Sequence, residues 1–167
     1  MGLFSFIKEA GEKLLGGKEV EATATQAATD PQAKRSLDAL NDKAARAIEN
    51  YIASQKLGVQ GVRVEYDGAT GTVDVSGQAP TQEALEKVTL CCGNVASVKQ
   101  VNNLMAVSSP EPEAQYHDVV RGDTLSAIAK KYYGDANKYP KIFEANKPML
   151  SHPDKIYPGQ KLRIPAL

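Results

Sequence analysis

The C-terminal third of the chain begins with His117-Asp118-Val119-Val120-Arg121-Gly122-Asp123-Thr124-Leu125 and ends with Ile156-Tyr157-Pro158-Gly159-Gln160-Lys161-Leu162-Arg163-Ile164-Pro165. At the start of this segment His117 and Val119 stand two positions apart, and at its end Leu162 and Ile164 do the same. Because side chains two positions apart share one face of a strand, this alternation is typical of β-structure. We therefore expect a short strand at each end of the segment.

Two short helices are expected between these strands. Their predicted buried residues, spaced three and four apart in the first helix, are Leu125, Ile128, Ala129, Tyr132, Ile142, Phe143 and Ala145. Asp123 or Thr124 stands at the N-cap of the first helix, and Gly134 stands where that helix should stop. Pro140 suits the first turn of the second helix.

The order strand–helix–helix–strand resembles a LysM domain, which we place at residues 116–167. The motifs that carry the resemblance are Gly122-Asp123-Thr124-Leu125, Ala145-Asn146 and Ile156-x-Pro158-Gly159-Gln160-x-Leu162-x-Ile164-Pro165. One position departs from the family, because His117 stands where these domains usually have Tyr. The resemblance implies a groove for N-acetylglucosamine polymers such as peptidoglycan. Its residues here would be Gly122, Asp123, Thr124, Leu125, Ile156 and Tyr157.

The middle of the chain predicts a second small domain. A helix is expected over 33–57, a hairpin of strands 62–66 and 72–77 around a turn at 67–71, a helix over 81–92 and a third strand over 100–107. This order, with Gly71-x-Val73-x-Val75-x-Gly77 and Val98-x-x-Val101, resembles a BON domain at residues 33–107. Together with the LysM segment, it predicts an α+β protein.

The rest of the chain is divided into a helix, a tether and a linker. Residues 1–17 predict an amphipathic helix, because Leu3, Ile7, Ala10 and Leu14 form one apolar stripe. This helix either docks on the protein itself or lies on a membrane surface, and its balanced charge favours the first. Residues 18–32 are an Ala/Thr-rich tether, and residues 108–115 form a short acidic linker. Two domains joined by so short a linker should touch.

Composition excludes several classes of function. The 167 residues carry 20 basic and 20 acidic side chains, so the formal net charge is zero, which argues against nucleic acid as a partner. No apolar run is long enough to span a membrane and no secretory signal is present, so we expect a cytoplasmic protein, which we take to be a monomer. No acid–base or nucleophile constellation is visible, so we expect no enzyme. The adjacent Cys91 and Cys92 are expected to be buried, inert thiols.

The whole arrangement, from Met1-Gly2-Leu3-Phe4 through both domains, resembles the cytoplasmic bacterial potassium-binding proteins of BON–LysM architecture. The resemblance implies a sensor or buffer that binds K⁺ and becomes compact. Potassium is a large, weakly hydrated cation that is selected by neutral carbonyl oxygens. Helix ends and turns display such carbonyls, and the loop 92–98 is small, apolar and uncharged. We therefore expect one K⁺ to be held by backbone carbonyls of Ile7, Ala10, Gly93, Val95 and Val98.

Two alternatives remain open from sequence. The loop 92–98 could be only a connection packed under the N-terminal helix. The protein could also bind peptidoglycan through the LysM groove, although the chain shows no route to the cell exterior.

Overall fold

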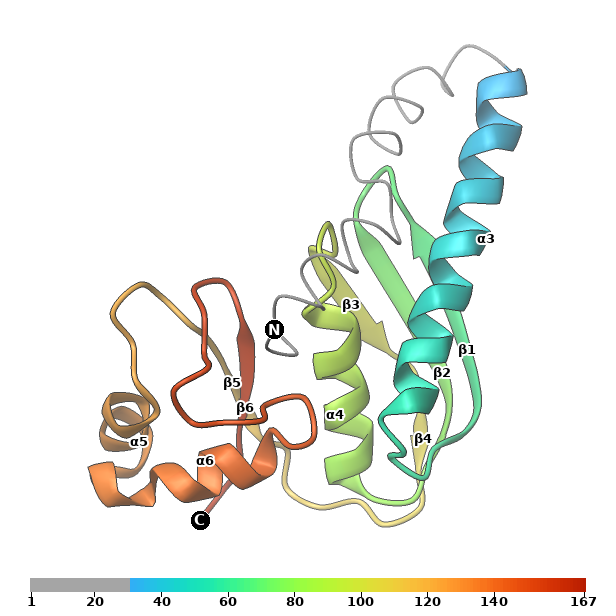
Figure 1. The fold of residues 1–167 in the computed structure, drawn as a ribbon. Coiled ribbons are helices and arrows are strands. Elements are labelled where there is room, and N and C mark those ends of the chain that lie inside the picture. The colour runs from blue at the N-terminus through green and yellow to red at the C-terminus, as the bar shows by residue number, and fades with distance from the viewer. Residues whose placement is uncertain (1–30) are drawn as a thin grey trace.

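The computed structural model describes residues 31–167, which form two α+β domains side by side (Figure 1). The first domain contains α3 (Pro31–Ser54), β1 (Gln60–Asp67), β2 (Thr72–Ala79), α4 (Gln82–Gly93), β3 (Gln100–Asn103) and β4 (Ala106–Val107). The second contains β5 (Gln115–Asp118), α5 (Leu125–Tyr133), the 3-10 turn η1 (Ala136–Lys138), α6 (Tyr139–Ala145) and β6 (Lys161–Ile164). The predicted fold class is confirmed. The predicted N-terminal helix, with Ile7 and Ala10, and residues 18–30 of the predicted tether lie outside the described residues.

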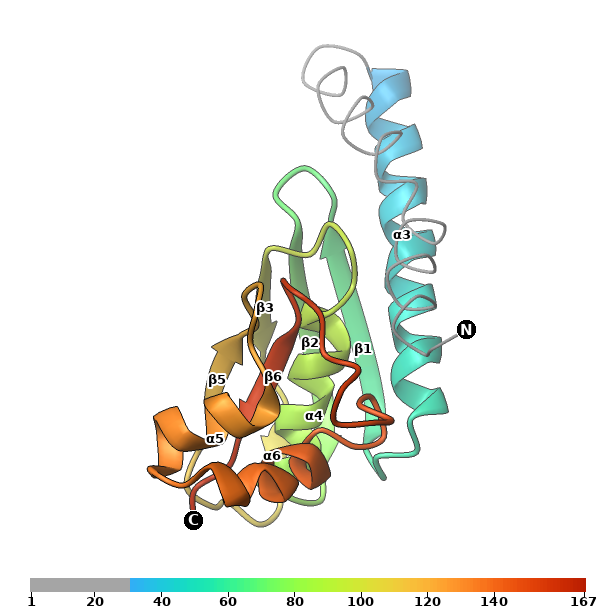
Figure 2. The same ribbon diagram turned by 60° about the vertical axis from the view of Figure 1, so that its left-hand side comes forward.

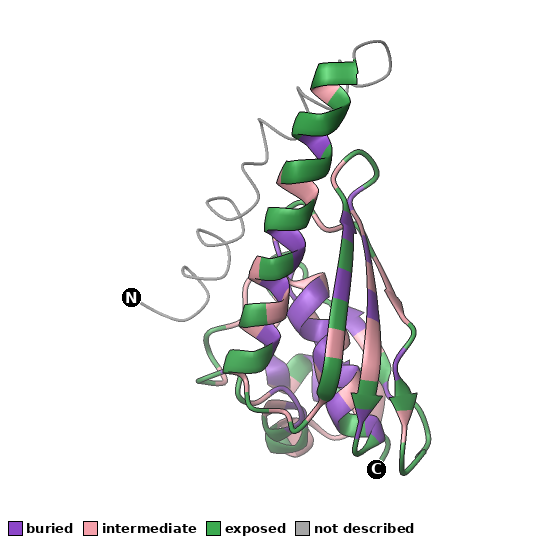
Figure 3. Ribbon diagram, turned by 90° about the vertical axis from the view of Figure 1, so that its right-hand side faces the viewer, coloured by how far each residue is buried: buried purple, intermediate pink, exposed green. Residues whose placement is uncertain are grey.

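The sheet of the first domain is built around β2. Strand β1 pairs with β2 in antiparallel fashion, and β3 and β4 both run parallel to it on its other side. Helices α3 and α4 cover one face of this sheet, and no other element of residues 31–167 covers the opposite face (Figure 3). Val64, Tyr66, Val73 and Val75 point into the layer between sheet and helices, as the alternating pattern predicts.

The predicted third strand over 100–107 is wrong in one respect, because it is divided into β3 and β4. At the break, the side chain of Asn103 turns inward and accepts the backbone N–H of Met105 at 3.0 Å. Its amide also donates to Leu85 O and Thr89 Oγ1 on α4, each at 2.9 Å. Leu104 is then left 67% exposed. Local competition by an Asn side chain explains the interruption.

The ends of the helices agree with the capping residues that the sequence predicts. Thr81 and Thr124 are the N-caps of α4 and α5, where each hydroxyl accepts a backbone N–H at 3.1 Å. Gly134 ends α5 in the left-handed conformation. Helix α3 differs from its predicted range of 33–57, since it begins at Pro31 and ends at Ser54, whose hydroxyl bonds to Tyr51 O.

The second domain has a small core of its own between the hairpin β5–β6 and the helices α5 and α6. Its fully buried side chains include Ile128, Ile142, Leu150 and Leu162. Tyr132 and Phe143 are half-buried rather than buried as predicted. Asn146, which follows α6, donates to Ile142 O and pairs with both backbone groups of Arg163. The side chain of Asn146 thereby ties α6 to β6.

The two domains share a packed interface, as the short linker predicts. Strand β6 lies against α4, and Figure 2 shows it crossing in front of that helix. Met149 of the second domain is 3% exposed and belongs to the core cluster of the first domain. Across the same interface Arg163 Nε donates to Glu86 Oε2, and both residues are buried. The interface is therefore a continuation of the first core, with one ion pair inside it.

Candidate functional site

The loop that follows α4 carries three of the predicted site residues on two consecutive turns. Helix α4 ends at Gly93, and the N–H groups of Asn94 and Val95 return to Leu90 O at 3.0 Å and Cys92 O at 3.2 Å. The chain then turns again, because Val98 N–H donates to Val95 O at 3.2 Å. One turn runs from Cys92 to Val95 and the next from Val95 to Val98. The carbonyl groups of Gly93, Val95 and Val98 therefore lie within a short stretch of backbone.

The carbonyl groups of this loop differ in availability. Within residues 31–167 no hydrogen bond is made to the carbonyl oxygen of Gly93 or of Val98, whereas that of Val95 accepts one. A carbonyl oxygen has two lone pairs, so Val95 can still accept a second partner. Val95 is buried, and Gly93 and Val98 are half-buried. The described part of the chain therefore offers three neutral oxygens, two of them unused.

The loop is held against the β1–β2 hairpin by a close backbone contact. Gly71 has a φ of +72°, and its carbonyl accepts Lys99 N–H at 2.8 Å and Gln100 N–H at 3.3 Å. A Cβ at Gly71 would lie 2.6 Å from Ser97 O, and Ser97 itself has a φ of +72°. The approach of these two backbones needs glycine on one side, which explains why the turn carries Gly71.

A groove of about 520 Å³ runs past this loop between the two domains. Its lining residues are Thr89, Gly93, Val98, Lys99, Gln100, Val101, Tyr116, Asp118, Gly159 and Lys161. The stem of Lys161 packs on Gly93, but its ammonium is drawn away to Asp118 Oδ1 at 2.7 Å. Burial raises the pKa of Tyr116 to about 12, so that side chain enters the groove as a neutral phenol.

Four of the predicted glycan-groove residues, Gly122 to Leu125, lie at the N-terminus of α5, and three of them have structural roles. Asp123 Oδ2 accepts Val120 N–H at 3.0 Å and lies 2.8 Å from His117 Nε2, while Thr124 caps α5 and Leu125 is buried in the core. The Val120 N–H and His117 hold the pKa of the Asp123 carboxyl below its usual value.

Backbone hydrogen bonds next to β5 and β6 bring the two sides of the predicted glycan groove together. Val119 N–H donates to Gln160 O and Gly159 N–H donates to Val119 O, both at 2.8 Å, so the loops that carry Gly122 and Tyr157 are joined. Ile156 packs against the second core, and burial raises the pKa of Tyr157 to about 12.

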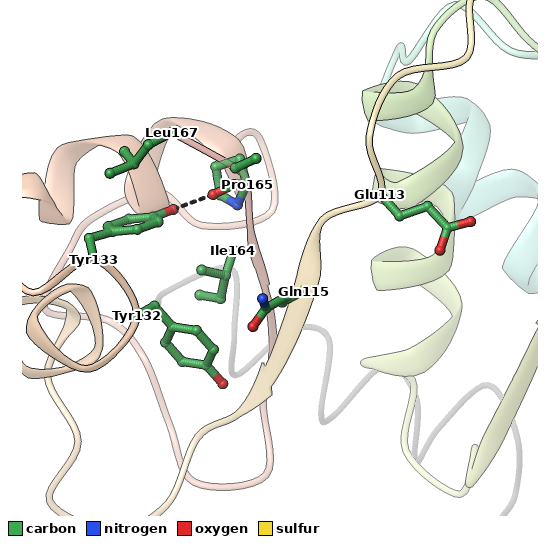
Figure 4. Close-up of a pocket in the computed structure, with 8 residues that line it drawn as sticks. Glu113, Gln115, Tyr132, Tyr133, Ile164, Pro165 and Leu167 are labelled. Carbon is green, nitrogen blue, oxygen red and sulfur yellow. Dashed lines mark hydrogen bonds between the residues drawn. The ribbon is translucent and has the colours of Figure 1, made fainter.

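A second hollow, of about 240 Å³, lies at the C-terminal end of β6 (Figure 4). Tyr132, Tyr133 and Ile164 are on its wall, and the hydroxyl of Tyr133 donates to Pro165 O at 2.7 Å. None of the predicted site residues lines it.

Residues 31–167 contain no group of three or more His, Cys, Asp or Glu side chains placed to hold a metal ion. Within the same residues no helix is long and apolar enough to cross a membrane. Cys91 and Cys92 are free and completely buried, and burial raises the pKa of both thiols, for Cys91 to about 12.

Sequence reasoning did not identify the side chain of Asn94, which is a central contact of this site. Its amide donates to Lys161 O at 3.2 Å and its oxygen accepts Lys161 N–H at 2.8 Å, across 67 residues of sequence. The buried pair of Glu86 and Arg163 was missed as well. An Asn after a helix and a Glu within one are ordinary in sequence, so no local signal could have revealed either contact.

Comparisons with known proteins agree with this architecture. The BON-domain family model matches residues 40–109, and the LysM-domain family model matches residues 117–165. The fold therefore defines a protein that joins a BON domain to a LysM domain. A protein of Escherichia coli O6:H1 named potassium binding protein Kbp is 43% identical over 166 residues, which cover 99% of each chain. The chain belongs to the family of that protein.

Two further relatives match only a short part of the chain. An uncharacterized protein of Deinococcus radiodurans is 54% identical over 50 residues, which are 30% of this chain and 19% of that protein. An esterase of Mycobacterium tuberculosis is 45% identical over 53 residues, or 32% of this chain and 11% of the esterase. The relative that spans the full chain is named for binding rather than for catalysis.

Proposed function

We propose that this protein is a cytoplasmic potassium-binding protein that acts as a K⁺ sensor or buffer. The observation that carries the proposal is 43% identity, over 99% of each chain, to a protein named for binding potassium. The loop after α4 supports it, because neutral carbonyls are the ligands that suit K⁺ and those of Gly93 and Val98 accept no hydrogen bond within residues 31–167.

We assign the ion to backbone carbonyls of Gly93, Val95 and Val98, completed by those of Ile7 and Ala10. The three described residues lie on consecutive turns within residues 93–98, and this closeness along the backbone supports the assignment of more than one of their oxygens to the same ion. The N-terminal segment supplies the remaining oxygens when it closes over the loop. A ligand that binds only the closed form shifts the population toward it, so one ion makes the protein, as a monomer, more compact.

The test is a titration with KCl against NaCl at matched ionic strength, read by amide NMR and by small-angle scattering. Saturable shifts at residues 93–98 and a smaller radius of gyration with K⁺ alone are the expected results. Equal responses to the two salts contradict the function. In a second arm, residues 1–15 are deleted, which should weaken K⁺ binding and leave the LysM signals in place. Unchanged affinity after the deletion would remove Ile7 and Ala10 from the site.

A second candidate is binding of N-acetylglucosamine polymers such as peptidoglycan. The match of residues 117–165 to the LysM family model favours it. Co-sedimentation with insoluble peptidoglycan tests it, with Tyr157→Ala as the groove variant and Tyr139→Ala, on α6 and outside the predicted groove residues, as the control. Retention of the wild type and loss of Tyr157→Ala alone would establish this second function.

A further inference from the structure

In the sheet that residues 31–167 form from β5 and β6, the outer edge of β6 is paired by two asparagine side chains. Strand β5 pairs with one edge of β6. The backbone N–H and C=O groups of Lys161 and Arg163 point to the opposite edge. Asn146 accepts Arg163 N–H and donates to Arg163 O, both at 2.8 Å. Asn94 does the same at Lys161, at 2.8 and 3.2 Å. A carboxamide therefore imitates one residue of a neighbouring strand at each position.

The two asparagines come from different domains. Asn146 belongs to the LysM domain and ties β6 to α6 within it. Asn94 belongs to the BON domain and stands between Gly93 and Val95, whose carbonyls we assign to the ion. Its backbone N–H is also fixed, because it donates to Leu90 O at 3.0 Å. Asn94 thus holds the ion loop by its backbone and the LysM sheet by its side chain.

We propose that Asn94 is a positioning residue that couples the ion loop to the LysM domain. This inference rests on the proposed potassium site and extends it by naming the residue that transmits occupancy across the interface. The side chain of Asn94 reaches both backbone groups of Lys161 only while the chain leaves α4 by the turn seen here. Whatever stabilises that turn therefore stabilises the docking of the two domains, and docking in turn favours the turn.

The side chain of Asn94 also fixes the start of β6 and the loop before it in the second domain. Lys161 follows Gln160, whose carbonyl accepts Val119 N–H, and Gly159 N–H donates to Val119 O. The segment 157–161 is therefore fixed at one end by the BON domain through Asn94. The neighbouring contacts of Glu86 with Arg163 and of Met149 with the first core add affinity to the interface, but neither side chain belongs to the ion loop.

The test replaces Asn94 by Ala and uses Asn102→Ala as the matched control. Asn102 also makes two side-chain hydrogen bonds, to Asp74 and from Gln100, but both are on the sheet of its own domain. Two readouts are taken for each protein, with KCl and with NaCl. The first is the rotational correlation time of each domain from ¹⁵N relaxation, and the second is the K⁺ affinity by calorimetry.

In KCl the wild type and Asn102→Ala should each show one correlation time for both domains. In Asn94→Ala the two domains should be docked for a smaller fraction of the time, so their correlation times should differ, while LysM signals remote from the interface stay unchanged. K⁺ should bind about tenfold more weakly, because two neutral hydrogen bonds that favour the closed form are lost. The rise in Tm that K⁺ causes should shrink in this variant, whereas a merely structural loss would lower Tm equally in both salts.

The outcomes separate this inference from the proposed function. If Asn94→Ala keeps one correlation time and wild-type K⁺ affinity, the coupling role is wrong while the potassium site stands. If the wild type binds no K⁺ and Asn94→Ala still gives the two domains different correlation times, the docking contact stands but its role in ion binding is overturned.

Discussion

Tyr51 on α3 carries a buried hydroxyl for which residues 31–167 supply no hydrogen-bond partner. Burial raises its pKa above the usual value, and the neighbouring Cys91 and Tyr157 add to that rise. A buried hydroxyl without a partner loses its bonds to water and gains none in return. The hydroxyl of Tyr133 is the opposite case, because it donates to Pro165 O at 2.7 Å (Figure 4).

Removing these two hydroxyls should change stability in opposite directions. Tyr51→Phe should raise the free energy of unfolding by about 1 kcal/mol, since it removes an unsatisfied polar atom and keeps the ring. Tyr133→Phe should lower it by about 1 kcal/mol, since it leaves the Pro165 carbonyl without its donor. Urea denaturation of both variants measures the difference. A loss of stability in Tyr51→Phe would show that this hydroxyl has a partner in solution.

The lowered pKa of Asp123 predicts how the unfolding free energy of the LysM domain changes at low pH. Its pKa is lowered in the folded state, first by Val120 N–H and then by His117, from an ordinary value of 3.8. The stabilisation is therefore complete above pH 3.8 and is lost as the pH falls through the lower, folded pKa. Unfolding of the wild type should become easier in that window, and Asp123→Asn, which starts less stable, should show less of this change.

The control for this prediction is Asp154→Asn, because the side chain of Asp154 is 91% exposed. It should follow the wild-type curve of unfolding free energy against pH. Parallel curves for Asp123→Asn and the wild type between pH 2 and 5 would contradict the role of Asp123.

Among the elements, the turn between β1 and β2 and the loop after α4 depend on each other. Gly71 and Gly61 both have positive φ, of +72° and +60°. A Cβ at Gly71 would meet Ser97 O at 2.6 Å, whereas a Cβ at Gly61 would meet nothing within 4 Å. Comparing alanine substitutions at the two glycines therefore distinguishes the cost of backbone strain from the cost of a clash with the loop.

Gly71→Ala should be more damaging than Gly61→Ala. Both pay about 1 kcal/mol for a side chain in the left-handed region, and Gly71→Ala must also displace Ser97. We expect a further loss of about 1–3 kcal/mol in unfolding free energy and, if the loop binds K⁺, weaker binding in Gly71→Ala alone. Equal effects of the two substitutions on both quantities would show that the loop does not depend on this contact.

At the scale of the whole molecule, the two domains meet through an interface that contains charges. Glu86 is 2% exposed and accepts hydrogen bonds from Arg163, from Ala114 N–H at 2.9 Å and from Gln82 at 3.0 Å. A buried charge is tolerated because its partners satisfy it, and removing one partner leaves the other unpaired. Glu86 therefore joins α4, the linker and β6 in one network.

Glu86→Ala should destabilise the protein by about 3–5 kcal/mol, because Arg163 remains buried without a counter-charge. The double variant Glu86→Met with Arg163→Met should recover most of this loss, since no unpaired charge remains. Thermal unfolding measures both, and separate transitions for the two domains are expected in Glu86→Ala. A double variant as unstable as Glu86→Ala would mean that the cost lies in Ala114 and Gln82 instead.

Many of the helices and strands of this protein can be predicted from short-range patterns in its sequence. The alternation in 72–77 and 162–164, the caps Thr81 and Thr124, and the stop at Gly134 predict elements that the structure contains. Each of these signals acts over a few residues, because capping, turns and side-chain alternation are short-range. The burial of Cys91 and Cys92 was predictable for the same reason, since they continue the apolar face of one helix.

Contacts between distant segments were decided by the tertiary structure alone. The inward turn of Asn103 divides a strand that alternation predicts to be continuous. The pairing of Asn94 with Lys161 and of Glu86 with Arg163 joins residues 67 and 77 positions apart. Such contacts depend on how two complete domains pack. From the local sequence alone, the same side chains would be interpreted as solvent-exposed caps or as exposed positions on a helix. The sequence by itself determined the domains, and their packing determined how the candidate ion loop is held.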